Sequence, residues 1–203
     1  MTRAKGAAYA AAVSLFFAVI GCSKLTELAN KASNSNTQPQ AGKTWVSYDL
    51  ASTDMHAELP GPPKDESPAL PEAYKAFYTA MHIYAYDAKD FQSSFTELVS
   101  TGKKKFEIKT LADTSMTVMK KQLTDLDSTV DVRSPTNAHV SGSFTKGGKN
   151  LELTGCVVYK KGANPEKVWS IFALYPKDSP DLKTQAERIV ASASFKDSTE
   201  SCK

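Results

Sequence analysis

The sequence predicts an α+β fold in which an antiparallel meander of β-strands is flanked by helices. Apolar and polar residues alternate over much of residues 129–176, and short glycine-containing turns interrupt the alternation. Apolar side chains also recur at helical spacing, most clearly over residues 112–126 and 182–190. Each of these helices needs an apolar surface to cover, and the meander between them in the chain supplies one.

The first 22 residues carry a pattern typical of an export signal. Arg3 and Lys5 give a positively charged start without acidic residues, and a largely apolar stretch of 14 residues runs from Ala7 to Ile20. This stretch is shorter than the ~20 apolar residues that a membrane-spanning helix needs. We therefore expect residues 1–21 to be a signal peptide that is removed.

Residues 19–22, Val-Ile-Gly-Cys, resemble the bacterial lipobox. The resemblance implies a lipoprotein that is cut before Cys22 and carries acyl chains such as palmitate on that residue. Two or three chains hold a protein on a membrane more firmly than one chain does. Ser23 in place of aspartate implies sorting to the outer membrane of a diderm bacterium. The alternative is an ordinary secretory signal in which Cys22 occurs by chance.

We expect three parts in the chain: the signal peptide, a lipidated N-terminus with a flexible linker over residues 22–43, and a single α+β domain over residues 44–203. The linker ends in SNSNTQPQAGK, whose composition favours a solvated coil. The full chain has 25 basic and 22 acidic residues, and removal of Arg3 and Lys5 leaves 23 against 22. Because this balance is nearly neutral, it does not indicate a nucleic-acid partner.

The domain is expected to begin with short extended segments at residues 44–50 and 55–59, followed by a turn-rich stretch at residues 60–68. Residues 75–86 favour a strand, although their alanine and methionine content leaves a helix as the alternative. The strand would place two sets of side chains on opposite faces. They are Phe77, Met81 and Ile83 on one face, and Tyr78, His82, Tyr84 and Tyr86 on the other.

Two helices are expected next. Phe91, Phe95 and Leu98 have helical spacing, with Asp90 as a possible N-cap and Gly102 as a stop. The second helix is expected to begin at Thr110, which together with Asp113 resembles a capping box. Its apolar stripe should pack on the sheet. That stripe consists of Ala112, Met116, Met119, Leu123 and Leu126.

The meander is clearest over residues 139–175. Gly147 and Gly148 are expected to supply the positive φ angles of a tight hairpin. The last strand, residues 168–175, is apolar on both faces and should lie between two layers. A final helix follows, with Ser179 as N-cap, Pro180 in its first turn and a buried stripe. The stripe is Leu182, Ala186, Ile189 and Val190.

The order of elements and the closing segment AERIVASASF, residues 186–195, resemble the PsbP-like α/β/α sandwich. The resemblance covers roughly residues 45–196. It implies a domain that binds or scaffolds a partner rather than one that catalyses a reaction. The sequence has no site motif that matches the family, so no binding residue follows from the resemblance.

Cys156 and Cys202 remain once Cys22 is assigned to lipid, and an even pair in an oxidising compartment favours a disulfide. Such a bridge would attach the C-terminal tail to a strand of the sheet. The alternative is a buried free thiol at Cys156 with a frayed tail.

Few residues suggest chemistry, because the common nucleophile, metal and nucleotide motifs are missing from the sequence. An extended backbone would place Asp54, His56 and Glu58 on one face, as a possible metal or proton site; the alternative is a solvated polar face. Tyr78, Tyr84 and Tyr86, together with Tyr74, are candidates for a recognition surface, with a buried position as the favoured alternative. We expect no cofactor other than the covalent lipid on Cys22.

The sequence therefore favours a membrane-anchored envelope lipoprotein with a non-enzymatic binding or scaffold domain. Its expected partners are membrane lipid, through the acylated N-terminus, and an envelope protein. A carrier of a small ligand, lipid or glycan is the second hypothesis, and it requires a lined pocket. A hydrolytic enzyme is the third, and it requires a nucleophile and a base that folding brings together.

Overall fold

The structure is a computed structural model and describes residues 44–103, 106–123, 125–160, 162, 165–196 and 198–202. The predicted signal peptide, Cys22 and the linker lie outside the described residues. Within the described residues, no helix combines the length and the apolar character that crossing a bilayer requires.

The centre of the domain is a seven-stranded sheet in which every neighbouring pair is antiparallel. Its order is β3-β4-β5-β9-β8-β7-β6, so the chain crosses the sheet between β5 and β6. The strands are β3 (Lys64–Asp65), β4 (Tyr78–Ala88), β5 (Phe91–Ser100), β6 (Asp127–Ser134), β7 (Asn137–Lys146), β8 (Lys149–Lys160) and β9 (Lys167–Pro176).

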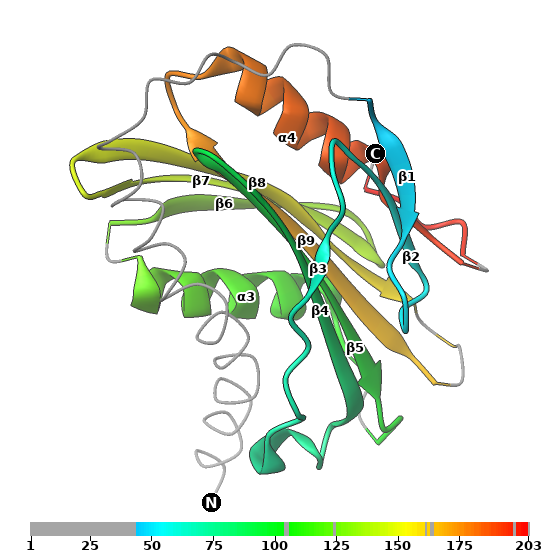
Figure 1. Ribbon diagram of the computed structural model, residues 1–203. Coiled ribbons are helices and arrows are strands. Elements are labelled where there is room, and N and C mark those ends of the chain that lie inside the picture. Colours follow the sequence, from blue (N-terminus) through cyan, green and yellow to red (C-terminus); the bar gives the residue numbers. More distant parts are fainter. Residues whose placement is uncertain are drawn as a thin grey trace, which may run out of the picture.

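Other elements cover both faces of this sheet (Figure 1). The helix α3 (Ile108–Gln122) packs on β6, β7 and β8 from one side, and α4 (Pro180–Ser192) packs on β8 and β9 from the other. Beside α4 lies a small sheet with the order β1-β2-β10. It consists of β1 (Val46–Asp49), β2 (Met55–Leu59) and β10 (Ser194–Phe195), and a short 3₁₀ turn η1 (Glu72–Tyr74) precedes β4.

The predicted fold class, α+β with an antiparallel sheet flanked by helices, is confirmed. Each face of the sheet has its own apolar core. Met116, Leu98 and Phe172 belong to the core on the α3 side, and Ile189, Phe95 and Trp169 belong to the core on the α4 side. Strand β9 lies between β5 and β8 and contributes side chains to both cores, as its two apolar faces predict.

The hairpin between β7 and β8 has the expected turn. Lys146 pairs with Lys149, and the two residues between them, Gly147 and Gly148, have φ angles of 59° and 75°. These positive angles suit a two-residue hairpin turn, whose twist matches that of the flanking strands.

The prediction of a helix at residues 91–102 is wrong, because this segment forms the strand β5 (Phe91–Ser100). Asp90 does not cap a helix; its φ of 53° places it in the turn between β4 and β5. Phe91 and Phe95 face the α4 side and Leu98 faces the α3 side. Since both faces of β5 are covered, apolar residues occur on each, and their spacing imitates that of a helix.

The other expected helices are present, but the details of their caps differ. Helix α3 begins at Ile108, two residues before the expected start, and Glu107 at its N-cap makes no side-chain cap hydrogen bond. Asp113 instead accepts from Lys109 Nζ at 2.6 Å. Ser179 is the N-cap of α4, as expected, although its hydroxyl makes no cap hydrogen bond. Leu123 and Leu126 follow α3 and remain buried in the α3-side core.

Candidate functional site

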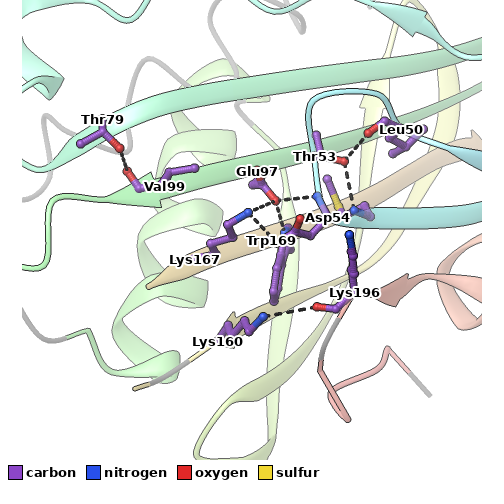
Figure 2. A network of polar contacts seen from close by, with 11 residues as sticks. Leu50, Thr53, Asp54, Thr79, Glu97, Val99, Lys160, Lys167, Trp169 and Lys196 are labelled. Atoms are coloured by element: carbon purple, nitrogen blue, oxygen red, sulfur yellow. Dashed lines mark hydrogen bonds and ion pairs between the residues drawn. The ribbon is translucent and has the colours of Figure 1, made fainter. Parts of the chain in front are cut away.

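A partly buried ionic network joins the main sheet to the small sheet (Figure 2). At its centre, the Glu97 side chain on β5 is 1% exposed. Glu97 Oε2 accepts hydrogen bonds from Trp169 Nε1 at 2.7 Å and from the backbone N–H of Asp54 at 3.0 Å. Lys167 Nζ lies 3.5 Å from the same oxygen and 2.6 Å from Asp54 Oδ2. Three segments that are distant in sequence thus meet around the buried carboxylate of Glu97.

The pairing of β5 with β9 positions three of these side chains. Glu97 pairs with Trp169, and Lys167 lies two residues before Trp169 on the same strand. Side chains two residues apart project from the same face of a strand, so all three point toward the α4 side. Placing a charge here requires close partners, because an unpaired buried carboxylate is costly.

The fourth residue, Asp54, comes from the tight loop between β1 and β2. Thr53 Oγ1 donates to the carbonyl of Leu50 at 2.7 Å and accepts from the backbone N–H of Met55 at 3.0 Å. These two bonds fix the loop and direct the Asp54 amide and carboxylate toward the main sheet (Figure 2).

The C-terminal segment closes the cluster. The backbone N–H of Lys196 donates to the Asp54 carbonyl at 2.8 Å, and Lys160 Nζ donates to the Lys196 carbonyl at 3.3 Å. The Phe195 ring stacks on the Trp169 indole with 4.4 Å between centroids. The network therefore holds β2, β9 and the tail against one another.

The geometry of the network indicates a structural role. A general acid or base must come within hydrogen-bonding distance of a substrate proton. Glu97 is enclosed, and its Oε2 is already occupied by three protein donors. The sequence did carry one signal for this residue: Glu97 is the only charged residue between Phe91 and Ser100.

The predicted group of Asp54, His56 and Glu58 does not form one site. Asp54 precedes β2 and bonds Lys167, whereas the Nδ1 of His56 contacts the carboxylate of Asp49. Glu58 Oε2 accepts from Arg188 of α4 at 2.8 Å. Among the described residues, no three His, Cys, Asp or Glu side chains lie close enough together to hold a metal ion.

The candidate tyrosines take the buried position that the sequence analysis favoured over a recognition surface. Tyr74, Tyr78, Tyr84 and Tyr86 are all at most 6% exposed. A β-bulge between Tyr78 and Ala80 shifts the alternation, so Tyr78 joins the α3-side core while Tyr84 and Tyr86 join the α4-side core. Without this bulge, a regular strand would place all three tyrosines on one face.

The buried tyrosines are also poor acids at neutral pH. Burial, followed by the hydrogen bond to Glu166, raises the pKa of Tyr159 to about 12. Burial, followed by the charge of Asp65, raises the pKa of Tyr84 above its ordinary value. Neither phenol supplies an ionised nucleophile under physiological conditions.

A second polar cluster lies where the C-terminal tail crosses β7. A disulfide joins Cys156 of β8 to Cys202, with 5.8 Å between the two Cα atoms. Asn137 Nδ2 donates to the Ser201 carbonyl, and Thr136 Oγ1 donates to Glu200 at 2.7 Å. The pairing of the two cysteines was one of the two alternatives that the sequence left open.

His139 on β7 pairs with Cys156 of β8 and lies partly buried beside this tail. Burial, followed by the charge of Arg133, lowers the pKa of His139 below its ordinary value. Asp131 and the Cys202 backbone act in the opposite direction and are weaker. The fold therefore favours the neutral imidazole. His82 is partly exposed on β4.

These features define a mixed α+β domain whose antiparallel sheet is covered on both faces and whose buried carboxylate, Glu97, is bound by neighbouring protein groups. Comparison with known proteins adds little to this description. No family model and no curated protein matches the chain. A solved structure that it resembles is that of LpqN, described as involved in cell envelope biogenesis of Mycobacterium tuberculosis. The TM-score is 0.38 at 15% identity, over 75% of this chain and 91% of LpqN.

Proposed function

We propose that this protein is a lipoprotein of the bacterial cell envelope whose α+β domain binds or scaffolds a partner without catalysing a reaction. Acyl chains on Cys22 hold it on the outer membrane, facing the periplasm or the cell surface. The observation that carries the proposal is the order of features in residues 3–22: a positive start, a short apolar stretch and a lipobox-like end.

Two features of the domain support this proposal. A disulfide between Cys156 and Cys202 suits the oxidising compartment to which an export signal leads. The buried charge of Glu97 and its partner Lys167 are committed to holding the small sheet in place. A domain that uses its ionisable groups in this way is better suited to presenting a rigid surface than to acid–base chemistry.

Intact mass of the protein extracted from membranes tests the anchor. We expect a chain that begins at Cys22 and carries the added mass of two or three acyl chains. A Cys22→Ser variant should lack this mass and should leave the membrane fraction. A mature wild-type chain with an unmodified N-terminus would contradict the proposal.

Affinity capture tests the scaffold role: the purified, tagged protein is added to detergent-solubilised envelopes, with its Cys22→Ala form as the control for non-specific membrane association. We expect one stoichiometric protein partner with both forms, because the domain rather than the lipid makes the contact. Copurification of a lipid or glycan in place of a protein would instead support the carrier hypothesis.

A further inference from the structure

The two edges of the seven-stranded sheet differ sharply. At one edge, β3 has two residues, and prolines at positions 60, 62, 63 and 68 flank it. Short strands and prolines are common means of blocking a sheet edge. At the other edge, β6 has eight residues and contains no proline or glycine. Among the described residues, only β7 pairs with β6, so the outer edge of β6 is left open.

The side chains of β6 are of types that favour pairing with another strand. Thr129, Val130 and Val132 are β-branched, and such residues are enriched in strands. Val132 is 42% exposed, and the one comparably exposed large apolar residue in the described chain is Val46 at 43%. Val130 is partly buried and packs against the α3-side core. A strand added here would cover Val132 and extend that core.

When two copies of β6 run antiparallel, acidic side chains of one strand can lie opposite basic side chains of the other. Arg133 Nε lies 3.3 Å from Asp131 Oδ2, so these two side chains project from the same face. Asp127 lies four residues before Asp131 on the strand and projects from that face as well. A second β6 that runs antiparallel with Val130 opposite Val130 therefore brings Asp127 opposite Arg133, twice in each dimer.

We propose that two copies of this protein associate through their β6 strands, forming one continuous sheet across a two-fold axis at Val130. The pairing uses residues 127–133, the regular part of the strand before the irregularity between Val132 and Ser134. Shifting one strand by two residues, so that position 131 lies opposite itself, would oppose the two Asp131 carboxylates, which disfavours that register. The inference does not depend on the lipid anchor, because it rests on the domain alone.

Charge exchange tests the contact. The full chain is purified in mild detergent, and its dimer dissociation constant is measured by analytical ultracentrifugation. Arg133→Asp or Asp127→Arg alone should weaken the dimer about tenfold, because each places like charges opposite one another at two positions. The double variant carrying both changes should restore wild-type association. Reversal of the half-exposed Asp113 on α3, Asp113→Lys, is the matched control and should have no effect on association.

A single cysteine tests the register. In the Val130→Cys variant, the two introduced thiols face each other across the axis, so mild oxidation should give a covalent dimer. In Val132→Cys, the two thiols lie about 13 Å apart along the strands, four residues at ~3.3 Å each, and should not join. Val46→Cys, on β1 of the small sheet, should also remain monomeric. The wild-type chain gives the background from its own cysteines.

A chain that stays monomeric throughout the micromolar range overturns the proposal. So does a dimer that is indifferent to the single reversals at Asp127 and Arg133, or one that crosslinks through Val46→Cys rather than Val130→Cys. Capture of a different protein by β6, with no dimer of the purified chain, would also overturn it. Circular dichroism of each variant confirms that the fold is kept.

Discussion

At the scale of single residues, Glu97 illustrates how a charge becomes part of a protein interior. Its carboxylate is 1% exposed and receives donors from a lysine, an indole and a backbone amide. A buried ion pair gives up hydration, so its net contribution to stability is modest when all partners are present. Removing one partner is costly, because the remaining charge stays buried without compensation.

Glu97→Gln is therefore expected to destabilise the domain, although the amide is nearly isosteric. The amide oxygen keeps the bonds from Trp169 and Asp54 and loses the charge that offsets Lys167. We expect the free energy of unfolding to fall by about 2 kcal/mol, measured by urea denaturation. Asp131→Asn changes an exposed carboxylate and should stay within about 0.5 kcal/mol of wild type. Equal effects in the two variants would contradict the structural role of Glu97.

His139 is expected to make stability depend on pH. Its pKa is lowered in the folded protein, so the unfolded chain binds the proton more readily. Stability is therefore highest above the unfolded value of about 6.5 and falls as the pH drops toward the lowered folded-state pKa. His139→Gln should reduce the difference in unfolding free energy between pH 8 and pH 5. An NMR titration that places the folded-state pKa of His139 at or above 6.5 would refute this prediction.

At the scale of elements, close packing of β8 against β9 depends on a residue without a side chain. Gly155 pairs with Phe172 of β9 on the α3 side of the sheet. A Cβ at this position would lie 2.6 Å from Phe172 Cδ1, and it would also meet the backbone carbonyl of Ile171. The backbone of a central strand cannot move away without disturbing both cores.

Gly155→Ala is expected to lower the free energy of unfolding by more than about 2 kcal/mol, because overpacking strains the central strands. Ser141→Ala, an exposed position on the neighbouring strand β7, provides the control and should change stability by less than about 0.5 kcal/mol. Thermal and urea unfolding of both variants measure the difference. A stable Gly155→Ala protein would show that β8 and β9 can separate at this point.

At the scale of the whole molecule, the C-terminal tail fastens the layers on the α4 side. Phe195 stacks on Trp169 of β9, the Lys196 amide binds the loop before β2, and Cys202 is bonded to β8. The disulfide closes a loop of 46 residues that contains β9, α4 and β10. It thereby limits the freedom of the unfolded chain in the segment that supplies Lys167 and Trp169 to the ionic network.

Replacing both Cys156 and Cys202 with serine should lower the free energy of unfolding by about 4 kcal/mol, through restored chain entropy in the unfolded state. Thiol labelling of the unreduced, unfolded protein should find neither cysteine free. Reduced wild-type protein provides the control, since both residues should then react. Labelling of two thiols without reductant would contradict the bridge.

The sequence alone was sufficient to predict helices that bury one face and expose the other, and turns that require glycine. The stripe of α3, the stripe of α4 and the hairpin at Gly147 and Gly148 follow from periodicity and turn chemistry. The lipobox-like segment at residues 19–22 is likewise visible in the sequence, and its role stays a prediction. The PsbP-like resemblance also stays a prediction beyond the fold class.

Only the tertiary structure decided the rest, and the reasons are physical. Both faces of β5 are covered, so its sequence lacks the contrast that distinguishes a strand from a helix. One bulge at the start of β4 moved Tyr78 to the opposite face, which no local pattern reports. The network around Glu97 joins residues separated by 43 to 113 positions. Its geometry depends on which strands become neighbours, and that choice is made by packing of the whole domain.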